Sequence, residues 1–159
     1  MTELNDFTIF ISYSQLAVFH HSLKRPFNDW TARHNAQGFS WRPGSVSFLT
    51  IEEAGTHSVT AIVGVDEGEL APDAIRVIDV PFKVPPDGAV EIGSISDSKV
   101  LTLPSGMYQL RFEYYAGSNG RSPRVRLLFG RSDKPHFKMA RADSELSPGA
   151  DLLLTARPA

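Results

Sequence analysis

The stretch MYQLRFEYY, residues 107–115, decides the fold class because it alternates between two kinds of side chain. One series is large and apolar or aromatic: Tyr108, Leu110, Phe112 and Tyr114. The series between them is polar or charged: Gln109, Arg111 and Glu113. This period of two predicts a β-strand with one buried face, because successive side chains of a strand point to opposite sides of a sheet.

Segments with the same period recur along the chain, separated by turn residues. In FTIFISY, residues 7–13, the alternation places Phe7, Ile9, Ile11 and Tyr13 on the buried face. The other predicted strands are residues 15–20, 45–51, 57–65, 75–82, 89–95, 99–103, 124–130, 136–140 and 151–156. Short strands at this spacing, with no helices alternating between them, predict an all-β fold: an antiparallel β-sandwich of about nine to eleven strands.

One short helix is predicted in the loop near residues 29–37. Asn28 or Asp29 is a suitable N-cap for it, and Gly38 is a suitable residue to end it. The surrounding residues 22–44 are otherwise rich in loop-forming proline, glycine and asparagine. No linker divides the chain, so residues 1–159 are predicted to form a single domain.

The composition limits the classes of protein to consider. Cysteine is absent from the 159 residues, which excludes disulfides, thiolate metal ligands and a cysteine nucleophile. The N-terminal stretch MTELNDFTIF carries acids where a signal peptide has basic residues. No apolar run approaches the ~20 residues of a membrane span. The sequence therefore predicts a soluble cytoplasmic protein with no membrane partner.

The charges are unevenly distributed and argue against nucleic acid as a direct partner. The formal net charge is −2. Residues 1–110 hold 7 Lys/Arg and 13 Asp/Glu, whereas residues 111–159 hold 9 and 5. Arg124 and Arg126 would share one face of a strand, but no aromatic platform for bases accompanies them. We expect these arginines to be solvated side chains opposite a buried sheet face.

No motif with catalytic or metal-binding spacing is present, which predicts a protein that is not an enzyme and needs no cofactor or metal. The five histidines form neither an HxH nor an HExxH pattern. A GxSxG elbow, a phosphate-binding loop and a GxGxxG fingerprint are all absent. A serine–histidine–acid triad stays open as an alternative, with His57 or His136 as its base, because triad members are often far apart in sequence.

Acidic side chains and one tryptophan are the candidate binding residues. The densest acidic cluster is Asp66, Glu67 and Glu69, with Asp73 close behind. It has three interpretations: a calcium site without the DxDxDG pattern, a contact for a basic partner, or a solvated turn. Asp29 and Trp30 form a second candidate patch, since tryptophan is enriched at interface hot spots. For Trp41 we expect a packing role.

An ordered set of segments resembles the competence protein J family, also described as DNA-entry nuclease inhibitors. The first three are ISYSQLAVFHH at residues 11–21, PFNDWT at 26–31 and GFSWRPGSVSF at 38–48. VIDVPFKV at 77–84, EIGSI at 91–95 and LPSGMYQLRFE at 103–113 follow in the same order. The resemblance covers about residues 7–115, and residues 116–159 form a divergent, more basic C-terminal part.

The resemblance implies a bacterial immunity-type protein that binds a magnesium-dependent DNase and holds it inactive. Such an inhibitor performs no chemistry of its own. A DNase groove is basic because it holds phosphates, so carboxylates on loops would block it. This predicts Asp66, Glu67, Glu69 and Asp73 as contacts, with Asp29 and Trp30 as a second patch. The alternative function is a β-sandwich module that binds a small ligand, a carbohydrate or calcium.

Overall fold

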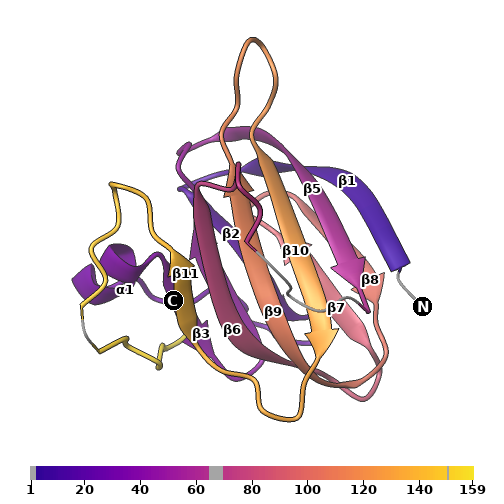
Figure 1. Ribbon diagram of the computed structural model, residues 1–159. Coiled ribbons are helices and arrows are strands. Elements are labelled where there is room, and N and C mark those ends of the chain that lie inside the picture. The colour runs from indigo at the N-terminus through magenta and orange to yellow at the C-terminus, as the bar shows by residue number, and fades with distance from the viewer. Residues whose placement is uncertain (1–2, 65–69, 150) are drawn as a thin grey trace.

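The computed structural model describes residues 3–64, 70–149 and 151–159, and this part of the chain forms eleven strands and one helix (Figure 1). The elements are β1 (Glu3–Ile11), β2 (Gln15–His20), α1 (Ala32–Gln37), β3 (Phe39–Arg42), β4 (Ser45–Leu49), β5 (Gly55–Val63), β6 (Arg76–Val84), β7 (Ala89–Gly93), β8 (Ser98–Thr102), β9 (Gly106–Tyr115), β10 (Arg124–Arg131) and β11 (Lys138–Arg141). Within it, no helix is long and apolar enough to cross a membrane. The predicted all-β fold with one short helix is confirmed.

The strands form two sheets that face each other. The larger sheet has the order β1-β5-β10-β9-β6-β11, and the smaller has the order β3-β4-β2-β7-β8. The neighbouring strands in the described part of the chain pair in antiparallel fashion except β5 with β10, where Val125 lies opposite Val59 in a parallel register. This pair departs from the antiparallel prediction because β10, which forms a hairpin with β9, lies on the β5 side of β9 and runs in the same direction as β5.

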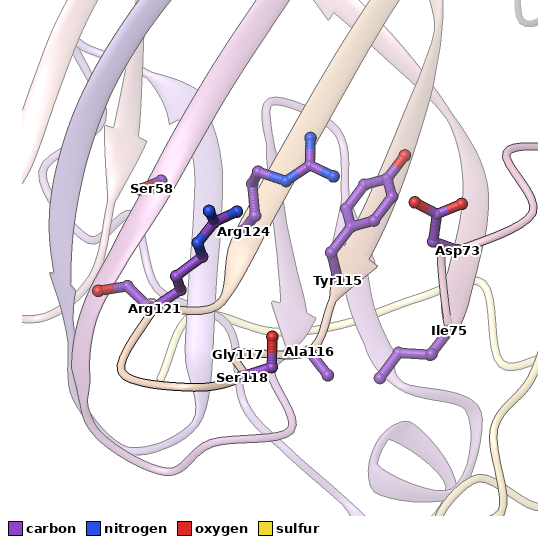
Figure 2. A pocket seen from close by; sticks show the side chains of 10 residues that line it. Ser58, Asp73, Ile75, Tyr115, Ala116, Gly117, Ser118, Arg121 and Arg124 are labelled. Atoms are coloured by element: carbon purple, nitrogen blue, oxygen red, sulfur yellow. The ribbon is translucent and has the colours of Figure 1, made fainter.

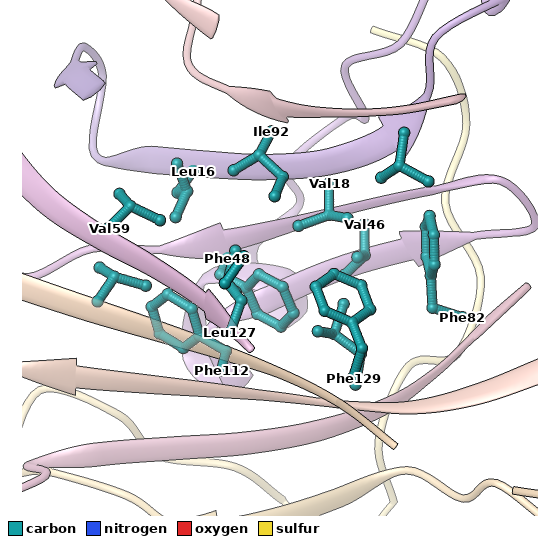
Figure 3. Close-up of a cluster of buried hydrophobic side chains, with 14 of the residues drawn as sticks. Leu16, Val18, Val46, Phe48, Val59, Phe82, Ile92, Phe112, Leu127 and Phe129 are labelled. Carbon is teal, nitrogen blue, oxygen red and sulfur yellow. The ribbon is translucent and has the colours of Figure 1, made fainter. Parts of the chain in front are cut away.

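The core lies between the two sheets (Figure 3). Phe48 of β4 stacks on Phe112 of β9 with ring centroids 4.5 Å apart and planes 5° from parallel. Leu16 and Val18 of β2 face Val59 and Leu127 of the larger sheet. The apolar series predicted in residues 107–115 is buried in this core. Burial of such side chains contributes about 1.5–3 kcal/mol each and is the main force that holds the sheets together.

The polar series of the same strand is also buried, although alternation alone predicts exposure. Arg111 donates to both carboxylate oxygens of Asp79 on β6, at 2.8 and 3.0 Å. Gln109 donates to the carbonyl of His136 at 2.9 Å, so the chain that precedes β11 covers this end of β9. The outer face of the larger sheet is thus partly covered, and charged groups on it pair between neighbouring strands, as Arg111 does with Asp79.

Helix α1 begins later than predicted and ends as predicted. Its N-cap is Thr31, whose hydroxyl accepts from the His34 backbone N–H, and neither Asn28 nor Asp29 fills that role. Gly38 ends the helix with φ 83°, in the left-handed region that glycine adopts without a steric penalty. The next four residues, Phe39–Arg42, form β3, which the sequence pattern missed.

The prediction of a strand at residues 151–156 is wrong. This segment runs past α1 and bonds to its side chains: Gln37 donates to the Leu153 carbonyl and accepts from the Leu153 N–H, both at 2.9 Å. A His34 ring nitrogen lies 2.9 Å from the Thr155 carbonyl. These side chains bond the backbone groups of Leu153 and the Thr155 carbonyl, which a strand partner would otherwise bond.

Five connecting segments meet at one end of the sandwich, and we call this end the loop end. The registers place the end of β1, the start of β5, the start of β10 and the end of β9 at the same end of the larger sheet. In the smaller sheet the same end holds the start of β2 and the end of β4. The loop end comprises residues 12–14, 50–54, 70–75, 94–97 and 116–123, the last of which forms the loop at the top of Figure 1.

Candidate functional site

A strained turn at the loop end projects an aromatic side chain into solvent. Tyr13 and Ser14, between β1 and β2, have φ angles of 56° and 57°. Positive φ is rare for a bulky residue such as tyrosine. The turn is held because Ser14 N–H donates to the Glu53 carbonyl and Thr50 N–H donates to the Ser14 carbonyl, both at 2.8 Å. The Tyr13 side chain covers nothing in the core, since the residue is 76% exposed.

Two further apolar side chains are exposed beside this turn. Phe10 is 47% exposed and Ile95 is 46% exposed. Hydrogen bonds join their segments: Phe10 N–H donates to a carboxylate oxygen of Asp97 at 2.8 Å. The Ser94 hydroxyl oxygen accepts from Ser12 N–H at 2.9 Å and lies 3.1 Å from the Ser12 carbonyl. We call Phe10, Tyr13 and Ile95 the apolar corner.

Carboxylates surround the apolar corner. Glu52 and Glu53 are exposed on the segment that follows β4, and Asp97 is half-buried beside Phe10. The same loop end carries a basic residue, because Arg121 lines a cavity together with Glu52. The corner therefore combines exposed apolar groups with a mainly acidic border.

An open cavity of about 720 Å³ lies on the neighbouring part of the loop end (Figure 2). Its lining includes Asp73, Tyr115, Arg121 and Arg124. The Arg124 guanidinium lies 4.0 Å from the centroid of the Tyr115 ring, a cation–π contact that fixes both side chains. Burial raises the pKa of the Tyr115 hydroxyl, which donates to Glu113 at 2.8 Å. The cavity is mixed in charge, with one carboxylate opposite two guanidinium groups.

The structure places Asp73 and Asp29, one residue from each predicted binding patch, in different cavities. Asp66, Glu67 and Glu69 lie outside the described residues, and Asp73 is exposed at the loop end. Asp29 is instead tied to the C-terminal segment: its carboxylate accepts from Arg157 N–H at 3.0 Å, and its N–H donates to the Arg157 carbonyl at 2.8 Å. Asp29 lines a different cavity from Asp73. Asp73, the described member of the acidic cluster, therefore lies apart from the cavity that Asp29 lines.

The tryptophans have structural contacts. Trp30 is half-buried, with its indole N–H 3.3 Å from the side-chain oxygen of Gln15 and its ring edge-on to His34. The packing role expected of Trp41 is confirmed: its indole N–H donates to the Pro81 carbonyl at 2.8 Å, and its ring packs edge-on against Phe137. Trp41 thereby joins β3 of one sheet to β6 of the other.

His57, one of the two histidines named as a possible triad base, has structural contacts. His57 is buried, and its two ring nitrogens lie 3.0 Å from the Gly55 carbonyl and 2.9 Å from the Tyr114 hydroxyl. Burial lowers the pKa of His57 and raises that of Tyr114 to about 12. Among the described residues, the ring of His57 bonds to a carbonyl and a hydroxyl, and the bonds of His136 involve its backbone, so neither shows the carboxylate contact of a triad base. Within residues 3–64, 70–149 and 151–159, no group of three His, Asp or Glu side chains is placed to hold a metal ion.

The apolar corner was missed by the sequence analysis. Alternation placed Tyr13 on the buried face with Ile9 and Ile11, and this is wrong because β1 ends at Ile11 and the turn redirects the next residues. The available signal was the polar run Ser12 to Gln15, in which Tyr13 is the single aromatic residue between two apolar strands.

These observations define the class of the protein: a two-sheet β-sandwich whose connecting segments gather at one end and present apolar and charged side chains there. The chain belongs to the competence protein J family, because the model of Competence protein J (ComJ) matches residues 8–130. The match extends through β9 and most of β10 and encloses all five segments of the loop end.

Two solved structures have the same fold. A crystal structure of ComJ from Bacillus subtilis, an inhibitor of the DNA-degrading activity of NucA, matches with a TM-score of 0.73 and 22% sequence identity, over 83% of this chain and 99% of that one. A second, Crocagin biosynthetic gene J, matches with a TM-score of 0.58 and 15% identity over the same shares. None of the curated proteins matches the chain in sequence.

Proposed function

We propose that this protein is a non-catalytic, immunity-type inhibitor that binds a magnesium-dependent DNase and blocks its DNA-binding groove. The observation that carries the proposal is membership of the competence protein J family over residues 8–130. The similarity of fold to ComJ, an inhibitor of the DNA-degrading activity of NucA, supports it.

The charges of the loop end suit this role. A nuclease groove that holds phosphates is basic, so carboxylates presented on loops are attracted to it and accelerate association. Glu52, Glu53 and Asp73 are exposed at this end. We propose that Asp73 contacts the nuclease together with Asp66, Glu67 and Glu69 of the preceding acidic stretch. Asp29 and Trp30 remain a second proposed patch, beside α1.

A cytoplasmic location belongs to the same proposal. The cysteine-free composition supports a reducing compartment, where disulfides are rare. Antibody detection of the protein in fractionated cells tests this point, and recovery from the secreted fraction would contradict it.

The function is tested with the DNase encoded in the same genome. The two proteins are co-expressed, and an affinity tag on the nuclease is used to recover the pair. The purified chain is then titrated into a DNA-degradation assay with magnesium in excess. We expect co-purification and a loss of DNase activity that is complete at a stoichiometric amount of inhibitor. Unchanged DNase activity with the inhibitor in large excess would refute the proposed function.

A further inference from the structure

The side chains of the apolar corner are exposed and do not belong to the core of the sandwich. Isolated exposed apolar residues are common on protein surfaces, but contiguous exposed apolar groups mark interaction sites. Phe10, Tyr13 and Ile95 come from segments that are hydrogen-bonded to one another through Ser94 and Asp97. The turn also keeps Tyr13 at positive φ while the side chain gains no burial in return. A partner that covers the ring would supply that burial.

The apolar corner continues into a groove on the outer side of the smaller sheet. The groove has a volume of about 430 Å³, and Ile95 and Asp97 line it as well as bordering the corner. Its other apolar walls are Phe19, Leu23 and Phe27, with the Phe19 and Phe27 rings in edge-on contact. On such a surface the projecting Tyr13 ring can enter a pocket of the partner, and the groove can hold an apolar side chain of the partner.

The charge around this surface favours a basic partner. Glu52 and Glu53 lie on one side of the corner, and Asp97 and Glu91 lie along the groove. The basic groups are Lys24 in the groove and Arg121 beside Glu52, together with His21, whose ring nitrogen lies 2.8 Å from a Glu91 oxygen. The four carboxylates therefore outnumber the two side chains with a permanent positive charge, Lys24 and Arg121. The surface complements the basic border of a DNA-binding groove.

We propose that the apolar corner is the docking surface for the nuclease, with Tyr13 as its central anchor and Glu53 as a charged contact at its border. This proposal rests on the proposed function and deepens it, because it names the surface that the nuclease covers. A tyrosine ring adds a large contact area with little loss of conformational freedom, which is why tyrosine is enriched at binding hot spots.

The decisive variant is Tyr13→Asn. Asparagine tolerates positive φ better than tyrosine does, so the substitution removes the ring while it keeps the turn. The control is Met107→Ala, which removes another exposed apolar side chain, 41% exposed against 76% for Tyr13, at the start of β9 on the opposite end of the sandwich. Thermal unfolding of each variant shows whether its fold is intact.

The measurement is the affinity of each purified full-length variant for the purified nuclease, together with inhibition of DNA degradation. We expect Tyr13→Asn to bind at least about 30-fold more weakly than the wild type, the loss that defines a hot spot, with no fall in melting temperature. Glu53→Lys should slow association, and the slowing should diminish at high salt. Met107→Ala should bind as the wild type does.

The possible failures are distinguishable. If the wild type inhibits the nuclease and Tyr13→Asn inhibits equally well, the apolar corner is not the docking surface, although the proposed function stands. If Met107→Ala weakens binding as much as Tyr13→Asn does, the nuclease does not select the loop end, and the docking proposal is refuted. If the wild type has no effect on the nuclease, both proposals fall.

Discussion

Replacing Arg76 by methionine should destabilise the protein strongly, because this arginine bridges three parts of the fold. It is fully buried at the start of β6. Its guanidinium donates to both carboxylate oxygens of Asp143, at 2.6 and 3.0 Å, and to the Leu49 carbonyl at the end of β4, at 2.6 Å. Arg76 thereby joins the larger sheet, the smaller sheet and the C-terminal segment beside the loop end.

The magnitude follows from what the substitution leaves behind. Removing one partner of a buried ion pair costs about 3–5 kcal/mol, because the other charge remains buried without it. The Asp143 side chain is 14% exposed, so water reaches it and the cost falls near the lower limit, about 3 kcal/mol. For a protein of this size that corresponds to a fall of roughly 6–12 °C in melting temperature.

The pH dependence of stability gives a second, independent test of the contact between Arg76 and Asp143. Burial opposes ionisation of Asp143, but its hydrogen bonds and its attraction to Arg76 outweigh burial and lower its pKa below 3.8. A carboxyl whose pKa is lowered by folding stabilises the protein above its unfolded pKa, and this contribution is lost as pH falls through the folded value. The stability difference between wild type and Arg76→Met should therefore shrink as pH falls below about 4.

Urea unfolding of wild type, Arg76→Met, Asp143→Asn and the double variant tests the reasoning. The double variant should lose clearly less than the sum of the two single losses, with a coupling of at least about 1 kcal/mol. A cost below about 1 kcal/mol for Arg76→Met, or additive losses, would show that the buried contact contributes little and that the bridge between the sheets lies elsewhere.

Three further predictions concern the core, the buried histidine and the strained turn. Phe112→Ala removes the ring stacked on Phe48 and should cost about 3–5 kcal/mol, measured by urea unfolding. Burial lowers the pKa of His57, so the folded state resists protonation; stability should be complete above pH 6.5 and fall as pH drops below that value. His57→Gln should flatten this fall, and equal slopes in the two proteins would contradict the assignment. Tyr13→Asn should raise stability by about 1 kcal/mol, or about 2–4 °C in melting temperature, because it relieves positive φ at a bulky residue; a lower melting temperature would be inconsistent with a strained turn.

The parts of the fold that depend on local alternation were predictable. In β9 every second residue from Tyr108 to Tyr114 faces the core, as the period of two requires. Gly38 ends α1 as expected, because its positive φ is a local requirement of the chain. The parallel pairing of β10 with β5 was not predictable, since pairing between distant segments leaves no periodic signal in either strand.

The candidate site was less predictable for the same reason. Asp29 is a charged residue in a loop, which suggested a surface patch. Its carboxylate instead accepts from the backbone N–H of Arg157, which is distant in sequence. Residues 151–156 contain three successive leucines and suggested a strand, but side chains of α1 satisfy their backbone groups. Tyr13 continued an apolar alternation that ended two residues earlier. In each case a contact between distant segments overrides the local pattern.

The most direct test of the account is hydrogen–deuterium exchange of the protein with and without the purified nuclease. The account predicts slower exchange in residues 12–14 and 94–97 of the complex, because the nuclease would cover the apolar corner. The turns at the opposite end, residues 43–44, 85–88 and 104–105, should exchange at unchanged rates. Absence of any change, or protection confined to that opposite end, would contradict the claim that this protein inhibits a nuclease through its loop end.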